Sequence, residues 1–177
     1  RPLARKKMDA LMRGCHDCPV CKYSKVRSVS FGSSQASVLV INEGIYHSQV
    51  TDGDTVVYPL QGTPEMEIID ALIDTYCINR QQLFFMNAVN CYTCTRVNGK
   101  DIERATNRQE AEYCRGYIED AIRIIDPVLI LLLGNIPLNL FCRGRTINEM
   151  HGKLININGV QAMPLYSPHA LISMRED

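Results

Sequence analysis

The sequence has no long apolar run, no secretion signal and no net charge. Its longest apolar run, 128–133, is far shorter than the roughly eighteen residues that a membrane-spanning helix needs. The start of the chain lacks the apolar core and small-residue cleavage site of a signal peptide. Lysines plus arginines and aspartates plus glutamates number 19 each, which excludes a global positive field. We therefore expect a cytoplasmic protein, intracellular and not secreted, with no membrane partner.

Apolar residues, in contrast, are plentiful: they make up 46% of 177 residues, enough for one sizeable core. We expect a single domain over residues 1–177. Because the chain begins at arginine rather than methionine, we expect a piece of a longer protein, with a fusion or protein partner. Basic residues gather near the amino end and indicate either contact with a phosphate backbone or a solvated face: Arg1, Arg5, Lys6, Lys7, Arg13, Lys22, Lys25 and Arg27.

Hydrophobic periodicity predicts strands that alternate with helices. Apolar and β-branched runs predict strands at 37–41, 83–89 and 128–134, followed by a hairpin around Asn158-Gly159 and a last strand at 162–167. Helical spacing predicts helices at 64–76 and 107–125 and a short one that begins near 138. This order indicates an α/β protein, a three-layer α/β/α sandwich with a mainly parallel central sheet.

Eight cysteines stand in a chain without an export signal, which favours metal or cluster binding over disulfides. The stretch CHDCPVC, residues 15–21, contains two overlapping C-x-x-C pairs, so either Cys15 or Cys21 can accompany Cys18. Cys91 follows a predicted strand and Cys114 lies in a predicted helix, so four sulfurs can converge on one centre. Four thiolates suit zinc as well as an iron-sulfur cluster, and the sequence alone leaves both open.

The order of short motifs along the chain carries a family resemblance. A C-x-x-C pair, a strand ending in Glu-Gly, an Asn-x-Val-x-Cys strand end and a terminal x-Pro-x-x-Leu loop follow one another, with CRGYIEDAI and PVLILLLG between the last two. This order resembles the uracil-DNA glycosylase superfamily, from about Cys15 to Ile172. The similarity is greatest to the iron-sulfur group called family four, which implies the fold of that superfamily.

By that resemblance Cys15, Cys18, Cys91 and Cys114 are the ligands of a four-iron four-sulfur (4Fe-4S) cluster, with Cys21 in reserve and zinc as the alternative. The cluster of this family is taken to be structural and to pin loops that contact DNA. The interval between Cys91 and Cys114 is longer than in the family, as if TRVNGKDIE, residues 95–103, were inserted into a loop.

The resemblance also implies a chemistry, in which a uracil is extruded from single- or double-stranded DNA and its N-glycosidic bond is hydrolysed. Asn87 matches the asparagine that reads the edge of the base, because an amide can both donate and accept hydrogen bonds. Glu43 matches the acidic residue of the first motif and is expected at the floor of the site. In that motif, NEGIY, Asn42, Ile45 and Tyr46 replace the glycines and proline of the family pattern.

Two further positions depart from the pattern at the expected active site. Leu60 stands where the family has its stacking phenylalanine, so Tyr46 or Tyr58 is the alternative ring. Ser167 stands at the position of the catalytic histidine, and His169 comes two residues later. Either Ser167 or His169 is expected to meet the departing base, although a serine hydroxyl carries no positive charge.

These substitutions leave two functions open. The first is a DNA glycosylase, a hydrolase of DNA repair, whose excision of uracil or a modified pyrimidine is altered or weakened. The second is a catalytically inactive module of glycosylase fold that binds DNA or supports assembly inside a larger protein. The sequence does not decide whether the protein is an enzyme.

Overall fold

A six-stranded sheet forms the centre of the molecule in the computed structural model, which describes residues 1–51, 53 and 55–174. The strand order is β2-β5-β3-β8-β10-β9. The four inner strands run parallel, and the edge strands β2 and β9 are antiparallel to their neighbours. The strands are β2 (Phe31–Gly32), β5 (Leu83–Asn87), β3 (Val38–Asn42), β8 (Leu129–Leu133), β10 (Val160–Leu165) and β9 (Ile155–Ile157).

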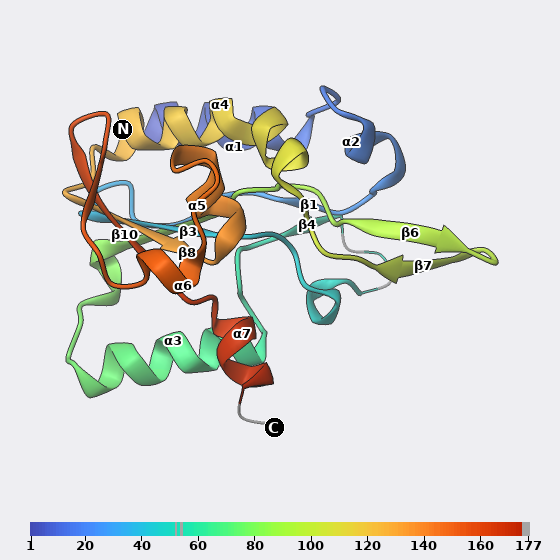
Figure 1. Ribbon diagram of the computed structural model, residues 1–177. Coiled ribbons are helices and arrows are strands. Elements are labelled where there is room, and N and C mark those ends of the chain that lie inside the picture. The colour runs from blue at the N-terminus through green and yellow to red at the C-terminus, as the bar shows by residue number, and fades with distance from the viewer. Residues whose placement is uncertain (52, 54, 175–177) are drawn as a thin grey trace.

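Helices cover both faces of this sheet (Figure 1). On one face lie α1 (Pro2–Arg13), α4 (Arg108–Ile125) and α5 (Asn135–Phe141), and on the other lie α3 (Pro64–Thr75) and α7 (Pro168–Ser173). The predicted three-layer sandwich with a mainly parallel sheet is therefore confirmed. The short elements are α2 (Pro19–Tyr23), α6 (Ile147–Met150), η1 (His47–Gln49), η2 (Arg80–Gln82) and the paired strands β1 (Arg27–Ser28) and β4 (Val56–Val57). No helix among the described residues is both long and apolar enough to cross a membrane.

The core has two parts, one on each face of the sheet, because side chains along a strand alternate in direction. Because successive side chains of a strand point to opposite faces, Leu39 and Ile41 of β3 join one buried cluster with residues of α1 and α4. Val40, between them, joins a second cluster with Met66 and Ile73 of α3. The inner strands are buried on both faces and read as continuous apolar runs, which is why the sequence located them.

Local signals explain where the longer helices begin. Thr63 precedes α3, and its hydroxyl accepts a hydrogen bond from the backbone N–H of Met66 at 3.2 Å. Asn107 precedes α4 and accepts from the N–H of Glu110 at 3.0 Å, while the Glu110 carboxylate accepts from the N–H of Asn107. This reciprocal pair of bonds is a capping box, which fixes the first turn of α4.

The inserted segment is a hairpin and not an extended loop. Strands β6 (Cys94–Val97) and β7 (Lys100–Glu103) pair antiparallel and project from the body of the molecule (Figure 1). Asn98 and Gly99 at the turn have φ of 50° and 80°, the left-handed conformation of a two-residue hairpin turn. The same dipeptide at Asn158-Gly159 forms the predicted turn between β9 and β10, and β10 continues without a break into the predicted last strand.

Part of the basic amino-terminal segment is used within the protein. Helix α1 buries Met8 and Met12 against the core. Arg5 donates to the carbonyl of Ser30 at 3.1 Å and forms an ion pair with Asp9 at 3.4 Å. Arg27 is buried at 7% exposure. These two cations are therefore neither part of a solvated face nor available to a phosphate backbone.

Candidate functional site

Two asparagines meet at the carboxyl ends of neighbouring strands. Asn42 ends β3 and Asn87 ends β5, and the two residues are register partners. The amide nitrogen of Asn42 donates to the Asn87 side-chain oxygen at 3.2 Å, and that of Asn87 donates to the hydroxyl of Ser28 at 3.0 Å. Asn87 is fully buried. Both ends of its amide are therefore already engaged inside the protein.

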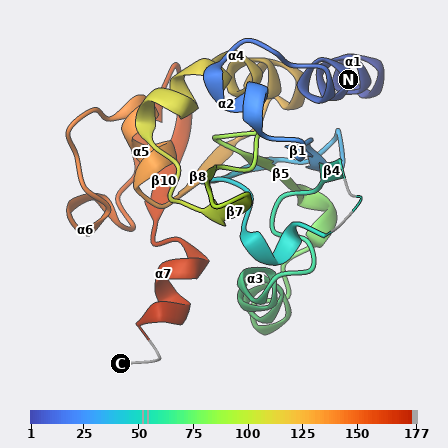
Figure 2. The ribbon, with the colours of Figure 1, turned by 90° about the vertical axis from the view of Figure 1, so that its right-hand side faces the viewer.

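A cavity of about 400 Å³ opens next to these strand ends. It lies where the chain leaves β3, where α5 and α7 begin, and at the base of the β6–β7 hairpin, an edge that Figure 2 shows with α5, α7 and β7. Ligands of α/β proteins bind at this edge of the sheet. The lining residues that carry charge or a ring are Glu43, Tyr46, Glu103, Arg104 and His169. Sequence reasoning located Glu43, Tyr46 and His169 but missed Glu103, the last residue of β7, and Arg104, which follows it.

The carboxylate of Glu43 lies against the start of α5. Its Oε1 accepts a hydrogen bond from the backbone N–H of Ile136 at 3.3 Å. Burial raises the pKa of Glu43, while the N–H groups of Ile136 and Asn135 and the nearby imidazole of His169 act in the opposite direction. Gly134 has φ of +96°, and a Cβ there would collide with this carboxylate. A glycine at the end of the PVLILLLG segment thus makes room for Glu43.

His169 is held in the wall of the cavity from two sides. Its Nδ1 lies 2.9 Å from Oε1 of Glu65, a buried residue in the first turn of α3. Its ring stacks on Tyr46, with the ring centroids 5.4 Å apart and the planes at 20°. The Tyr46 hydroxyl in turn donates to the Asn42 side-chain oxygen at 3.2 Å. Burial, followed by the charges of Glu43 and Glu65, raises the pKa of Tyr46, so its phenol remains protonated.

Ser167 does not line this cavity. It is buried at 6% exposure and precedes the first residue of α7, where its hydroxyl accepts a hydrogen bond from the N–H of Ala170 at 3.2 Å. A serine before a helix that begins with proline is a common cap. The structure therefore assigns the hydroxyl of Ser167 to the helix and brings His169 to the cavity.

Leu60 and Tyr58 also lie outside the cavity lining. Leu60 has φ of 63° and is fully buried in the cluster with Val40 and Phe85. The Tyr58 ring is directed toward Phe31, with the ring centroids 5.7 Å apart. Of the two tyrosines expected as a replacement ring, only Tyr46 is in a position to contact a molecule in the cavity.

Several cysteines gather where α2 meets the segment that follows β5. Cys18, Cys21 and Cys91 form one buried cluster with Val20. Burial raises the pKa of Cys91 to about 12, which the Arg27 charge partly offsets, whereas Cys114, Cys18 and Cys15 reinforce the increase. Burial likewise raises the pKa of Cys114 to about 11, against a hydrogen bond from the backbone of Asn90. Five sulfurs thus lie near enough to influence one another.

The side chains around these thiols have a donor set that suits an anionic centre. Arg27, whose backbone bridges to Cys91, is buried with its Nε unpartnered, and no carboxylate among the described residues pairs with it. The side-chain amide of Asn90, the residue before Cys91, is also buried without a partner. As placed, no three His, Cys, Asp or Glu side chains in the described ranges form a coordination shell. The sulfurs are brought together but are not arranged as ligands.

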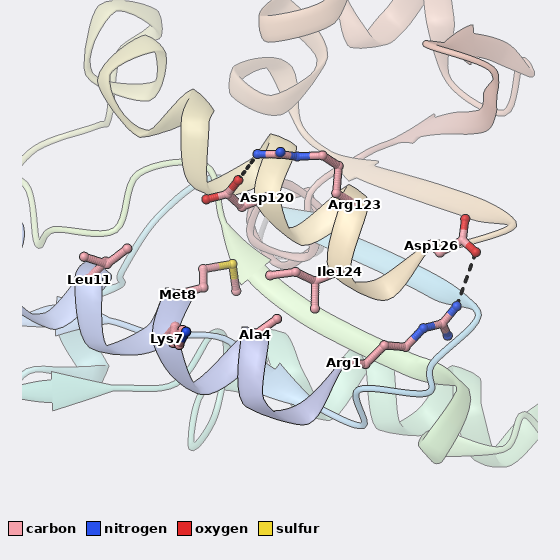
Figure 3. Close-up of a pocket in the computed structure, with 9 residues that line it drawn as sticks. All are labelled: Arg1, Ala4, Lys7, Met8, Leu11, Asp120, Arg123, Ile124 and Asp126. Atoms are coloured by element: carbon pink, nitrogen blue, oxygen red, sulfur yellow. Dashed lines mark hydrogen bonds and ion pairs between the residues drawn. The ribbon is translucent and has the colours of Figure 1, made fainter.

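A second hollow, of about 540 Å³, lies between α1 and α4 (Figure 3). An ion pair between Arg1 and Asp126 at 3.2 Å crosses its rim, and a second pair joins Arg123 and Asp120 along α4. Asp126 precedes β8, so this hollow lies toward the amino ends of the strands. It contributes nothing to the site at the carboxyl ends.

Comparison with known proteins finds similarity over most of the chain. The family model described as the uracil DNA glycosylase superfamily matches residues 45–177. The type-4 uracil-DNA glycosylase of Pyrobaculum aerophilum is 25% identical over 178 aligned residues, which cover 97% of this chain and 85% of that protein. The matched region includes Tyr46, Asn87, Cys91, Cys114 and His169, whereas Asn42, Glu43 and the cysteines of residues 15–21 precede it.

Proposed function

The chain belongs to the uracil DNA glycosylase superfamily, and from this premise we propose that it binds DNA and hydrolyses the N-glycosidic bond of uracil or a related modified pyrimidine. The observation that carries the proposal is the position of His169, whose imidazole lines the cavity beside Glu43. The cavity also contains Glu43, which the resemblance expects at the floor of the site. The rebuilt surroundings of the site support an altered or weakened excision.

His169 is the group that we assign to the departing base. When the bond between C1′ and the base nitrogen breaks, its electron pair leaves with the base, and an imidazole N–H can stabilise that negative charge. A water oxygen bonds to C1′, and its proton is lost to the solvent or the base. Glu43, held by the start of α5, lines the cavity and is the group that we assign to accept a hydrogen bond from this water.

Asn87 remains our candidate for reading the base. Because its amide is shared with Asn42 and Ser28, it can bond to a base only after one of those hydrogen bonds opens. Tyr46 lines the cavity, and its hydroxyl donates to the side-chain oxygen of Asn42, the partner of Asn87. We propose that an incoming base displaces the Tyr46 hydroxyl and so frees the asparagine pair.

We further propose that Cys18, Cys91 and Cys114, with Cys15 or Cys21, hold a four-iron four-sulfur cluster. When bound, such a cluster supplies no chemistry to the hydrolysis but ties the α2 segment, the end of β5 and α4 together. The unpartnered Nε–H of buried Arg27 and the backbone N–H of Asn90 directed at Cys114 are donors that would suit an anionic centre. Zinc is the alternative, because four thiolates bind it equally well.

A second candidate function is DNA binding without excision. It is favoured by the complete burial of Asn87 and by the absence of an aromatic ring at Leu60. In that case the chain should bind DNA with an affinity that falls steeply with salt, as contacts from Lys and Arg to phosphate require.

Release of the free base from a labelled uracil-containing oligonucleotide, single- and double-stranded, tests the proposal. We expect release by the parent protein and a loss of at least about 100-fold in rate for His169→Ala. His151→Ala is the matched control, because His151 lies outside this cavity. DNA binding by the parent without any release would support the second candidate and refute the first.

A further inference from the structure

A close contact between Glu65 and His169 joins α3 to α7 at the wall of the cavity. Glu65 Oε1 lies 2.9 Å from Nδ1 of His169, and the Glu65 side chain is 7% exposed against 61% for the imidazole. The second oxygen, Oε2, is buried without a partner. No hydrogen bond from Nε2 of His169 to a described residue is present, and that nitrogen lies on the far edge of the ring from Glu65.

A structural explanation for Glu65 is incomplete. The helix dipole favours an acidic residue in the first turn of a helix. Glu67, which is exposed in the same turn, already provides that interaction. A buried carboxylate carries a desolvation cost that the dipole of one surface turn does not offset. Its imidazole partner, in contrast, lies in the cavity wall together with Glu43, Glu103 and Arg104.

We propose that Glu65 is a positioning residue for His169. Its carboxylate accepts the hydrogen on Nδ1 and so fixes the tautomer or protonation state in which Nε2 carries the donor hydrogen. Tyr46 fixes the plane of the same ring by stacking. The pair therefore orients an N–H donor toward the base before the base arrives, in the way that a carboxylate orients the imidazole of a catalytic triad. This inference rests on the proposed function.

The test compares Glu65→Leu and Glu65→Gln with the matched exposed controls Glu67→Leu and Glu67→Gln. We expect Glu65→Leu to lower the single-turnover rate of base release by about 10- to 100-fold while the Kd for DNA changes less than about twofold. Glu65→Gln should recover part of the rate, because its amide oxygen can still accept from Nδ1. Both Glu67 variants should release base at the parent rate.

Nitrogen-15 NMR of the histidine side chains provides a second readout that needs no activity. The parent should show His169 with hydrogen on Nδ1, and Glu65→Leu should show a changed tautomer population. A rate for both Glu65 variants equal to that of the parent would overturn the assignment. So would a rate loss with an unchanged His169 spectrum, because Glu65 would then act through packing alone. A parent that releases no base refutes the proposed function, and the tautomer comparison still decides the pairing.

Discussion

Ser167 and His169 are two residues apart, yet at the start of α7 their side chains make different contacts. The Ser167 hydroxyl accepts from the N–H of Ala170 at 3.2 Å and is buried, while the His169 imidazole lines the cavity and pairs with Glu65. The residue that occupies the position of the family's catalytic histidine is therefore a helix cap, and the imidazole stands in the first turn.

Ser167→Ala tests this division of roles. Loss of the cap should lower the free energy of unfolding by about 1 kcal/mol, with the base-release rate of the folded protein changed less than about threefold. Urea unfolding and single-turnover kinetics measure the two quantities. Ser167→Thr, which keeps the hydroxyl, should restore most of the stability. A large loss in the base-release rate at unchanged stability would show that Ser167 takes part in the reaction.

Leu60→Phe should fail to restore a stacking ring. Position 60 is fully buried in the cluster around Val40 and lies outside the cavity lining, so a larger side chain meets core and not substrate. We expect a loss of about 1–3 kcal/mol in the free energy of unfolding from overpacking and no gain in base release. A faster release in the Leu60→Phe protein would show that residue 60 reaches the base.

Glu43 should impose a pH dependence on stability. Burial raises its pKa in the folded protein above the usual value near 4.5, so the folded state binds its proton more tightly than the unfolded state. Stability contributed by the protonated form is therefore present below that usual value and is lost as pH rises through the folded pKa. As pH rises from the usual pKa of a glutamate to the raised pKa of Glu43, the free energy of unfolding should fall more in the parent than in Glu43→Gln. Parallel curves of the two proteins against pH would contradict the shift.

Serine variants should distinguish the cysteines that bind the cluster from those that do not. We expect Cys91→Ser and Cys114→Ser to lose the broad visible absorption and the iron content of the purified protein, whereas Cys77→Ser, an exposed residue, keeps both. Either Cys15 or Cys21 is the fourth ligand, so only one of Cys15→Ser and Cys21→Ser should lose the visible absorption. A colourless parent protein that contains zinc would show that the cysteines bind zinc and not an iron-sulfur cluster.

The sequence determined the elements whose signals are local. Continuous apolar runs located β3, β5 and β8, because strands buried on both faces need apolar residues at every position. Asn158-Gly159 specified its turn, because both central residues of such a turn need positive φ. The Asn98-Gly99 turn carried the same signal, but exposed, mostly polar strands flank it, so a pattern of buried residues could not find the hairpin.

Tertiary structure alone decided how the site is assembled. Glu65 and His169 are 104 residues apart, and their pairing depends on the packing of α3 against α7, which no spacing in the sequence encodes. The positive φ of Leu60 turns that side chain into the core, and the first turn of α7 separates the tasks of Ser167 and His169. The residue types for a glycosylase-like site could be read from the chain. Which of them share a cavity is set by long-range packing, because side chains distant in sequence meet only once the layers have assembled.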